Sequence, residues 1–553
     1  MATEIISTSL TTPYLLDKDD DLIVTGTGSL IVDEADAIHT RSNLDTDLSI
    51  LVLGHVEATG LASPGLGASA VFLGGTFTNG AFDPSNNMVT VGITGSLEAL
   101  GGFGIVSLGS ATQVTNFGTI DADSGIVLRG GDNQILNTGA ITATSVGISI
   151  SGTDSAPKSD ASLIHNSGTI QVSAGAGILV QERWVTVIND GSIAGGIGVQ
   201  SSHASVWNTG TITQTTSPAV SFSAASGTLT NTGTISGQGS FATVEAMDGL
   251  KILNSGLIES DRIAIGGSIR SAMNDGIIAG GLDGISVGSS DRFDLINSGL
   301  IEGSQYGVFH SLGLRSHILN LGTISGLANG ASPGYSIFTD QVAGKVDNQG
   351  TLLGDVFVGF GRLTNDGTIT GDVTLGFGKL ANHGVIDGDV FLLDSNIYRS
   401  GSSGSVTGSI NGSGGLDRLF GGDLSDRMFG NDEADVISAS SGDDILTGGL
   451  GNDRLTGGTG ADLFIYTAAT DSDLITGIDR ITDFETGTDK IDLSAFLSGA
   501  AFISNAAFSG TGAEVRYNAA TGRLSGDVDG DGVADFAVLI VNNAAITAGD
   551  LIL

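Results

Sequence analysis

The chain has 553 residues, with 60 acidic and 21 basic side chains and a formal net charge of −39 at pH 7. So large a negative charge repels phosphate backbones, which excludes nucleic acid as a partner, whereas bound cations relieve it. The 88 glycines and 6 prolines favour short strands joined by tight turns, and the absence of cysteine excludes disulfides and thiolate metal sites.

Residues 1–115 contain alternating apolar runs such as DDDLIVTGTGSLIV and SAVFLGGTFTNGAF, but no regular repeat. We interpret them as an end cap and irregular first coils of the repeat that follows. The start of the chain lacks the basic and apolar regions of a secretory signal peptide. No apolar run reaches the roughly 18 residues of a transmembrane helix. Export would therefore need another route.

Residues 116–400 carry the pentapeptide Asn-x-Gly-x-Ile (or Leu) in thirteen copies, spaced 17 to 29 residues apart and most often 23. Each unit holds two or three short alternating strands, too few to bury an apolar face alone. This period predicts a parallel β-solenoid whose coils pair at about 4.8 Å. The repeats begin at Asn116, Asn137, Asn166, Asn189, Asn208, Asn231, Asn254, Asn274, Asn297, Asn320, Asn348, Asn365 and Asn382.

In that geometry the isoleucines stack inside the solenoid, and the asparagine amides bond to one another and to the backbone at a turn. The glycine two positions after each asparagine is expected to adopt positive φ. The last coils shorten to 17 residues. The Gly- and Ser-rich segment 401–411 is then predicted to be a linker.

Six nonapeptides follow in tandem from Gly412 to Ile465, with the pattern Gly-Gly-x-Gly-x-Asp-x-apolar-x. The glycines let backbone carbonyls turn toward one locus, where the sixth-position carboxylates complete a set of oxygen ligands suited to Ca²⁺. The eighth, apolar position is expected on a short strand that faces the interior. The predicted calcium ligands are Asp417, Asp426, Asp435, Asp444, Asp453 and Asp462.

This stretch resembles the RTX, or hemolysin-type, calcium-binding repeats. The resemblance implies a parallel β-roll with two nonapeptides per turn and Ca²⁺ between loops two repeats apart. Asp417, Asp435 and Asp453 would then line one side, and the other three aspartates the opposite side. Leu424 and Glu433 depart from the fourth-position glycine.

Residues 466–553 are predicted to form a β-rich cap. Asp479 to Phe496 resembles the closing segment of serralysin-type C-terminal domains, and the ending GDLIL resembles the signal read by type I secretion machinery, which implies that machinery as a partner. A third feature is the start of an EF-hand loop, matched by Asp527, Asp529, Asp531 and Asp535. Its twelfth position is valine instead of glutamate, so a partial calcium loop and an acidic turn both remain open.

Catalytic motifs are scarce. The zinc-protease signature His-Glu-x-x-His is absent, and Ser286 in GISVG occupies the slot of a solenoid strand, so it is not expected to be a nucleophile. Trp184 and Trp207 lie about one coil apart, and either a small sugar-binding patch or edge packing remains open for them.

The sequence thus predicts an all-β protein with a long parallel β-solenoid, an RTX β-roll and a C-terminal cap. We expect a secreted, calcium-binding structural or adhesive protein at the surface of a Gram-negative bacterium: a surface-layer component, adhesin or matrix protein. Its expected partners are type I secretion machinery and either further copies of itself in a lattice or filament or a cell-surface polysaccharide. The alternative is a polysaccharide-modifying enzyme, a lyase or an epimerase.

Overall fold

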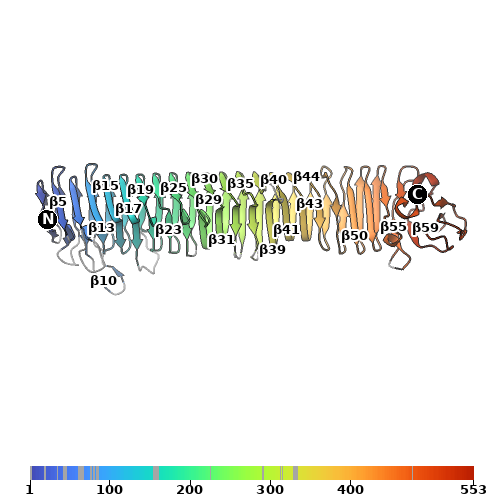
Figure 1. The fold of residues 1–553 in the computed structure, drawn as a ribbon, viewed down its shortest axis with the longest axis horizontal. Coiled ribbons are helices and arrows are strands. Elements are labelled where there is room, and N and C mark those ends of the chain that lie inside the picture. The colour runs from blue at the N-terminus through green and yellow to red at the C-terminus, as the bar shows by residue number, and fades with distance from the viewer. Residues whose placement is uncertain are drawn as a thin grey trace. The chain divides into compact units, whose positions relative to one another are not determined.

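A computed structural model shows a nearly all-β protein (Figure 1). Helix in the described residues is limited to α1 (Ser494–Leu497) and the 3-10 turns η1 (Ala469–Ser472) and η2 (Ala548–Asp550). The structure describes residues 3–17, 20–33, 35–40, 47–59, 68–74, 77–78, 81–82, 86–152, 161–224, 226–288, 292–311, 313, 315–327, 334–475 and 477–553. Within them no helix is long and apolar enough to cross a membrane.

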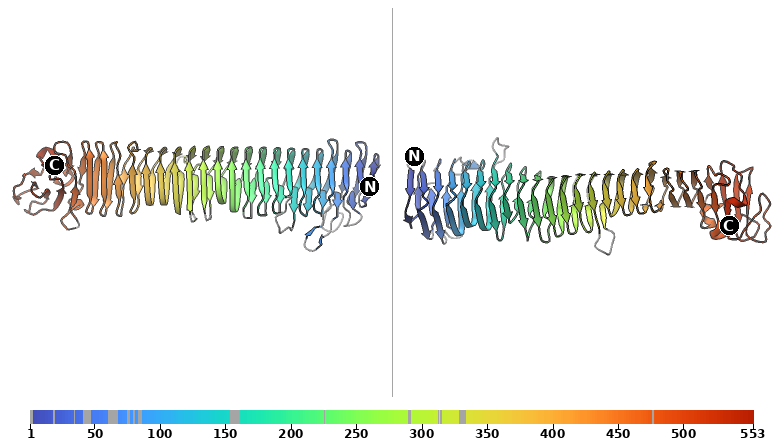
Figure 2. Two further views of the ribbon diagram at one scale, coloured as in Figure 1. Left: turned by 180° about the vertical axis from the view of Figure 1, so that it is seen from behind. Right: turned by 90° about the horizontal axis from the view of Figure 1, so that it is seen from above.

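The chain divides into two compact units. The first comprises residues 1–293 and 299–303, and the second comprises residues 294–298 and 304–553. Each is built from coils of short parallel strands, as Figure 2 shows. The predicted parallel β-solenoid is therefore confirmed.

A coil of the first unit has three strands, which lie on three faces named A, B and C in chain order. Each strand pairs in parallel with the strand of the same face in the next coil. Face A contains β1 (Thr3–Ile6), β4 (Asp21–Val24), β7 (Ser49–Val52), β12 (Met88–Val91), β14 (Gln113–Asn116), β16 (Gln134–Asn137), β18 (Leu163–Asn166), β21 (Thr186–Asn189), β24 (Ser205–Asn208), β27 (Thr228–Asn231) and the C-terminal parts of β29 (Val244–Asn254) and β31 (Ile263–Asn274).

Face B contains β2 (Ser9–Leu10), β5 (Ser29–Asp33), β8 (His55–Thr59), the N-terminal parts of β13 (Ser96–Ser107), β15 (Thr119–Arg129) and β17 (Ala140–Ser151), and β19 (Thr169–Val172), β22 (Ser192–Ala194), β25 (Thr211–Gln214), β28 (Thr234–Gly237), β30 (Leu257–Ser260), β32 (Ile277–Gly280) and β35 (Leu300–Glu302).

Face C contains β3 (Tyr14–Leu16), β6 (Ile38–Thr40), β9 (Ser69–Leu73), the C-terminal parts of β13, β15 and β17, β20 (Ala176–Val180), β23 (Ile197–Val199), β26 (Val220–Phe222), the N-terminal parts of β29 and β31, and β33 (Asp283–Val287). A separate antiparallel pair joins β10 (Phe77–Thr78) to β11 (Ala81–Phe82).

The described strands within residues 1–115 join these same three faces from β1 onward. They are first coils of the solenoid, as the sequence predicted, and their in-register pairing does not need the pentapeptide, while the end cap stays a prediction. Ser286 lies on β33 opposite Gly266, so GISVG is a solenoid strand as expected.

The core is a stack of apolar side chains that repeats from coil to coil. Alternating burial on each strand places one side inside and the other in solvent. The pentapeptide isoleucines of the first unit are all at most 1% exposed: Ile120, Ile141, Ile170, Ile193, Ile212, Ile235, Ile258, Ile278 and Ile301.

Buried asparagines form a hydrogen-bonded ladder at the end of the face A strands. In the first unit the Nδ2 of each asparagine from Asn116 to Asn254 donates to Oδ1 of the next, at 2.7–2.8 Å, so that these bonds connect Asn116 to Asn274. The same Nδ2 also donates to a backbone carbonyl; Asn208, for example, reaches Thr234 at 3.3 Å. The predicted asparagine stacking is confirmed in detail.

The expectation of positive φ at the pentapeptide glycines is wrong. Those glycines are not among the residues with positive φ; instead, a Cβ on Gly139 would meet the Gly118 carbonyl oxygen at 2.1 Å. Close approach of the neighbouring coil therefore requires glycine there. Positive φ occurs five residues before a ladder asparagine at Ala111, Asp132, Trp184, His203, Ser226 and Gly249. It also occurs at Asp47 and Asn86, five residues before Val52 and Val91, which occupy the same position in earlier coils.

The second unit begins with three-faced coils. Face A contains β34 (Phe293–Asn297), β37 (Arg315–Asn320), the C-terminal parts of β39 (Tyr335–Asn348), β41 (Asp355–Asn365) and β43 (Val373–Asn382), and β46 (Ile397–Ser400), β49 (Arg418–Phe420), β51 (Val436–Ser441), β53 (Arg454–Thr459), β55 (Asp479–Ile481) and β60 (Phe536–Ile540). Its asparagine ladder runs from Asn297 to Asn382.

Face B of the second unit ends early. Among the residues that the structure describes, it contains β38 (Thr323–Ser325), β40 (Thr351–Leu353), β42 (Thr368–Thr370), β44 (Val385–Asp387) and β47 (Ser405–Val406). Face C continues through β36 (Tyr306–His310), the N-terminal parts of β39, β41 and β43, and β45 (Val390–Leu392), β48 (Ile410–Asn411), β50 (Arg427–Asp432), β52 (Ile445–Leu450), β54 (Leu463–Ile465), β56 (Lys490–Asp492) and β61 (Leu551–Ile552).

The loss of face B converts three-sided coils into the two-sided roll. Residues 401–411 are not a linker: β47 pairs with β44, and β48 pairs with β45. Their small residues close the last three-sided coil. The Gly- and Ser-rich composition therefore reflects tight turns and not a linker. After the roll, the predicted β-rich cap is present as β57 (Ala501–Phe502), β58 (Glu514–Asn518) and β59 (Arg523–Asp527), with β58, β59 and β60 antiparallel.

Replacing Asn208 with alanine should destabilise the first unit by about 2–4 kcal/mol, because Asn189 Nδ2 and Asn231 Oδ1 would lose their ladder partners inside the protein. The measurement is the urea midpoint followed by circular dichroism. The control is Thr213→Ala, an exposed position on β25. Equal midpoints for the two variants would contradict the role assigned to the ladder.

Candidate metal centre

The roll is built from the nonapeptides of residues 412–465. Five of the six repeats have positive φ at both the second and the fourth position, and the second repeat is the exception. Glu433 adopts positive φ at a position where glycine is expected, and Leu424 does not. The eighth-position side chains are fully buried between the two remaining faces: Leu419, Met428, Ile437, Leu446, Leu455 and Phe464.

The six predicted aspartates lie in two columns. Asp417, Asp435 and Asp453 precede successive strands of face A, and the backbone N–H of each donates to Oδ1 of the next at 2.7 Å. Asp426, Asp444 and Asp462 precede strands of face C and are connected in the same way, at 2.7 and 3.0 Å. The structure thus brings these residues together in the two rows that a two-repeat turn implies.

The second carboxylate oxygen of most of these residues has no hydrogen-bond partner. Oδ2 is buried and unpartnered in Asp417, Asp435, Asp444, Asp453 and Asp462, whereas Oδ2 of Asp426 accepts the Gly422 N–H at 3.0 Å. A buried anionic oxygen without a partner is costly unless a cation binds it.

Glycine at the first position of a repeat faces this oxygen. A Cβ on Gly430 would lie 2.3 Å from Oδ2 of Asp435 and 2.5 Å from the Gly448 carbonyl oxygen. A carboxylate oxygen and a carbonyl oxygen therefore border one small space that a side chain would fill. Such hard oxygen donors suit Ca²⁺ and do not suit soft metals. The aspartates and first-position carbonyls fit the ion that the repeats imply.

Burial raises the pKa of these carboxyl groups well above the ordinary value of 3.8. The pKa rises to about 7 for Asp417, Asp444 and Asp453, to about 8 for Asp435 and to about 6 for Asp462. Neighbouring carboxylates add to this shift, because each coil places another aspartate above the last. Without a cation, protonation of these carboxyl groups reduces the negative charge of the site near neutral pH.

Two further aspartates extend the columns beyond the predicted set. The Asp453 N–H donates to Oδ1 of Asp479 at 2.8 Å, and the Asp462 N–H donates to Oδ1 of Asp489 at 3.0 Å. Oδ2 of Asp479 is also buried without a hydrogen-bond partner, and burial raises its pKa to about 9. The sequence signal was the pattern Asp-x-Ile in DRI and DKI, which repeats the sixth and eighth positions of the nonapeptide.

The predicted loop at residues 527–535 is partly assembled. One oxygen each from Asp527, Asp529 and Asp535 lies within 4.8 Å of the others. Asp531 is not in this group, and its Oδ1 accepts the Val533 N–H at 2.8 Å. Asp527 is buried and accepts two backbone N–H bonds, as a turn aspartate does. Calcium binding here stays a prediction.

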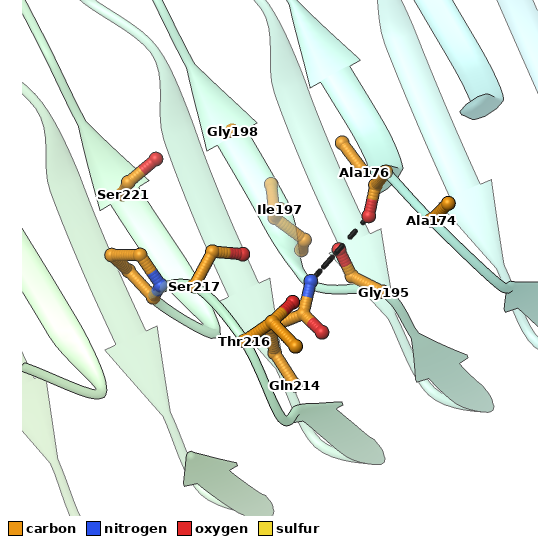
Figure 3. Close-up of a pocket in the computed structure, with 11 residues that line it drawn as sticks. Ala174, Ala176, Gly195, Ile197, Gly198, Gln214, Thr216, Ser217 and Ser221 are labelled. Carbon is orange, nitrogen blue, oxygen red and sulfur yellow. Dashed lines mark hydrogen bonds between the residues drawn. The ribbon is translucent and has the colours of Figure 1, made fainter. Parts of the chain in front are cut away.

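A cavity of about 280 Å³ lies on the first unit beside β20, β23 and β26 (Figure 3). Its polar side chains are Gln214, Thr216, Ser217 and Ser221, and Gln214 Nε2 donates to the Gly195 carbonyl at 3.0 Å. No ionisable side chain is among its described lining residues. These described lining residues thus offer no carboxylate, imidazole or amine for proton transfer.

The two tryptophans do not stack on each other. Trp184 stacks on His203, with ring centroids 4.2 Å apart, in the turn before face A. Trp207 lies on the outer side of β24, between Ile188 and Thr230 of the neighbouring coils. The two rings occupy different positions of the coil, so they do not form one stacked patch, and sugar binding at either ring stays a prediction.

Family comparisons agree with this architecture. Residues 428–553 match the family described as Peptidase M10 serralysin C terminal, and residues 25–195 match the BigA third pectate lyase-like domain. Serralysin C from Dickeya chrysanthemi is 40% identical over 89 residues, or 15% of this chain and 18% of that protein. Metallopeptidase AprA from Pseudomonas marginalis is 40% identical over 88 residues, with the same shares.

Residues 428–553 are thus similar to the C-terminal RTX domain of serralysins. The resemblance predicted from the nonapeptides and from residues 479–496 is thus confirmed. The chain spans about a fifth of the length of these curated relatives. A solved neighbour is the AlgE6R3 subunit of the Azotobacter vinelandii mannuronan C5-epimerase, 30% identical, covering 26% of this chain and 80% of that chain with a TM-score of 0.21.

The raised pKa values predict how pH affects the calcium-free RTX roll. Because the folded-state pKa values of these aspartates exceed the unfolded value, their protonated forms stabilise the fold below about pH 4, and this stability is lost as pH rises through about 6 to 9. Limited proteolysis in chelator should therefore cut residues 412–465 faster at pH 8 than at pH 5. A cleavage rate that falls as pH rises would contradict the assignment.

Replacing Asp435 with asparagine should have opposite effects with and without calcium. The amide keeps an acceptor for the Asp417 N–H and removes the buried charge, so the variant stabilises the calcium-free roll at pH 8. With calcium it loses an anionic ligand, and calcium affinity should fall about tenfold or more. Calorimetric titration and thermal melts measure both effects. Asp423→Asn, an exposed change in the same roll, is the control, and effects of one sign in both conditions would contradict the account.

Proposed function

We propose that this is a secreted, calcium-binding structural or adhesive protein whose RTX roll folds when it binds extracellular Ca²⁺. The observation that carries the proposal is the row of buried, unpartnered Oδ2 atoms on aspartates stacked two repeats apart. These atoms make the calcium-free roll costly and the calcium-loaded roll stable, because binding free energy becomes folding free energy.

Calcium-dependent folding of the roll and the absence of cysteine support export of the chain before it folds. A roll that is unfolded where calcium is scarce folds only where calcium is plentiful. The similarity of residues 428–553 to serralysin C-terminal domains supports type I secretion machinery as the export partner. The absence of cysteine means that no disulfide has to form on the way. We place the folded protein outside a Gram-negative cell or on its surface.

The solenoid supports a scaffold role. Its coils repeat the same in-register pairing, and the cavity of about 280 Å³ has no ionisable side chain among its described lining residues. Extended repeat surfaces of this kind suit contact with large partners more than binding of a small substrate. The partner we propose is a further copy of the protein, in a surface lattice or matrix, or a polysaccharide of the cell surface.

A second candidate is a polysaccharide-modifying enzyme. It is favoured by the match of residues 25–195 to the BigA third pectate lyase-like domain. Such an enzyme would place a base and charge-stabilising groups on the outside of the first unit.

Calcium titration of the full-length protein, followed by circular dichroism and light scattering, tests the first proposal. We expect the strand signal to rise in the millimolar range of calcium, together with ordered assembly or with binding to isolated cell-surface polysaccharide. The same samples incubated with pectate and alginate, analysed for new unsaturated ends and altered uronate composition, test the second. Turnover of either polymer without assembly or adhesion would replace the structural proposal with the enzymatic one.

A further inference from the structure

Three metal-ligating side chains meet on face B of the first unit, far in sequence from the roll. His55 and Glu57 lie on β8, and Glu98 lies on β13. The two strands pair in register, with His55 opposite Ser96 and Glu57 opposite Glu98. Val56 and Leu97 between them are buried, so the three side chains share the outer side of the face.

The ligand atoms are close enough for one ion. One atom from each of the three side chains lies within 4.8 Å of the others, and His55 Nε2 is 3.3 Å from Oε2 of Glu57. The other ring nitrogen, Nδ1, is 2.7 Å from Ser96 Oγ. With the proton on Nδ1, Ser96 accepts that hydrogen bond and Nε2 presents its lone pair to the carboxylates. Metal-binding histidines are held in this way by a second hydrogen bond.

The strand segments paired around this cluster are rich in carboxylates. Asp121 on β15 pairs with Glu98, so three carboxylates stand in register on successive coils. The paired segments 29–33, 55–59, 96–100 and 119–123 contain five carboxylates, one imidazole and no lysine or arginine in the part of the chain that the structure describes. Like charges directly opposite on neighbouring strands destabilise a sheet, and a bound divalent ion removes that repulsion.

We propose that His55, Glu57 and Glu98 bind a divalent transition metal of the Zn²⁺ class. An imidazole with two carboxylates suits Zn²⁺ or Co²⁺, whereas Ca²⁺ prefers oxygen ligands alone. Three protein ligands leave a coordination position for water or for a ligand from solution, because the site is on the outer side of the strands. The alternative is an ion pair between His55 and Glu57 without a metal.

The test uses the full-length protein in millimolar Ca²⁺, so that the carboxylates of the roll are occupied. Zn²⁺ is titrated by calorimetry, and Co²⁺ is titrated by its visible absorption, which reports imidazole and carboxylate ligation. The variants are His55→Gln, Glu98→Gln and Ser96→Ala. The control is His165→Gln, since His165 Nε2 pairs at 2.7 Å with one carboxylate, that of Asp190, on the same unit.

We expect one tight equivalent of Zn²⁺ in the wild type and in His165→Gln. Affinity should fall more than a hundredfold in His55→Gln and Glu98→Gln, and about tenfold in Ser96→Ala, which loses only the positioning hydrogen bond. Unchanged urea midpoints show that each variant is folded. The proposal is overturned if the wild type takes up no tight equivalent, or if His55→Gln binds Zn²⁺ as the wild type does, because His55 then forms only an ion pair.

Discussion

In a chain of stacked coils, a polar side chain buried at a turn has to find its hydrogen-bond partners inside the stack, chiefly at the same position in the next coil. An asparagine amide meets this constraint by itself, because it both donates and accepts. The amides of the ladder from Asn116 to Asn274 therefore satisfy one another without water or ions. A carboxylate only accepts, so a column of aspartates such as Asp417, Asp435 and Asp453 leaves one charged oxygen per coil without a donor.

The same hydrogen bond, from a backbone N–H to a side-chain Oδ1 in the next coil, occurs at turns with asparagine and at turns with aspartate. In the first unit, the Leu48 N–H donates to Oδ1 of Asn87, and the Thr112 N–H donates to Oδ1 of Asn133. In the second unit, the Asn396 N–H donates to Oδ1 of Asp417, where the charged column begins. Changing the amide to a carboxylate keeps the geometry and adds a requirement for a cation. The proposed calcium dependence thus needs little change in the fold.

Sequence periodicity predicted the parts of the fold that depend on stacking. The isoleucine core and the asparagine ladder follow from spacing, whereas the two rows of roll aspartates were implied by the resemblance to RTX repeats. The role of the pentapeptide glycines was missed, because the contact between the Gly139 and Gly118 positions is visible only when coils are stacked. Asp479 and Asp489 were missed because insertions separate them from the tandem repeats, although they keep the Asp-x-Ile pattern. The face B cluster joins His55 to Glu98 across 43 residues, a distance that no motif spans.

We propose that the unpartnered carboxylate oxygens make the RTX roll depend on calcium, whereas the asparagine ladder makes the solenoid independent of it. Hydrogen exchange measured by mass spectrometry on the full-length protein at pH 8, with calcium and with chelator, tests both halves together. Peptides from residues 412–465 should be protected only with calcium, and peptides spanning residues 186–260 should be protected equally in both conditions. Equal protection of the roll in chelator would contradict the claim.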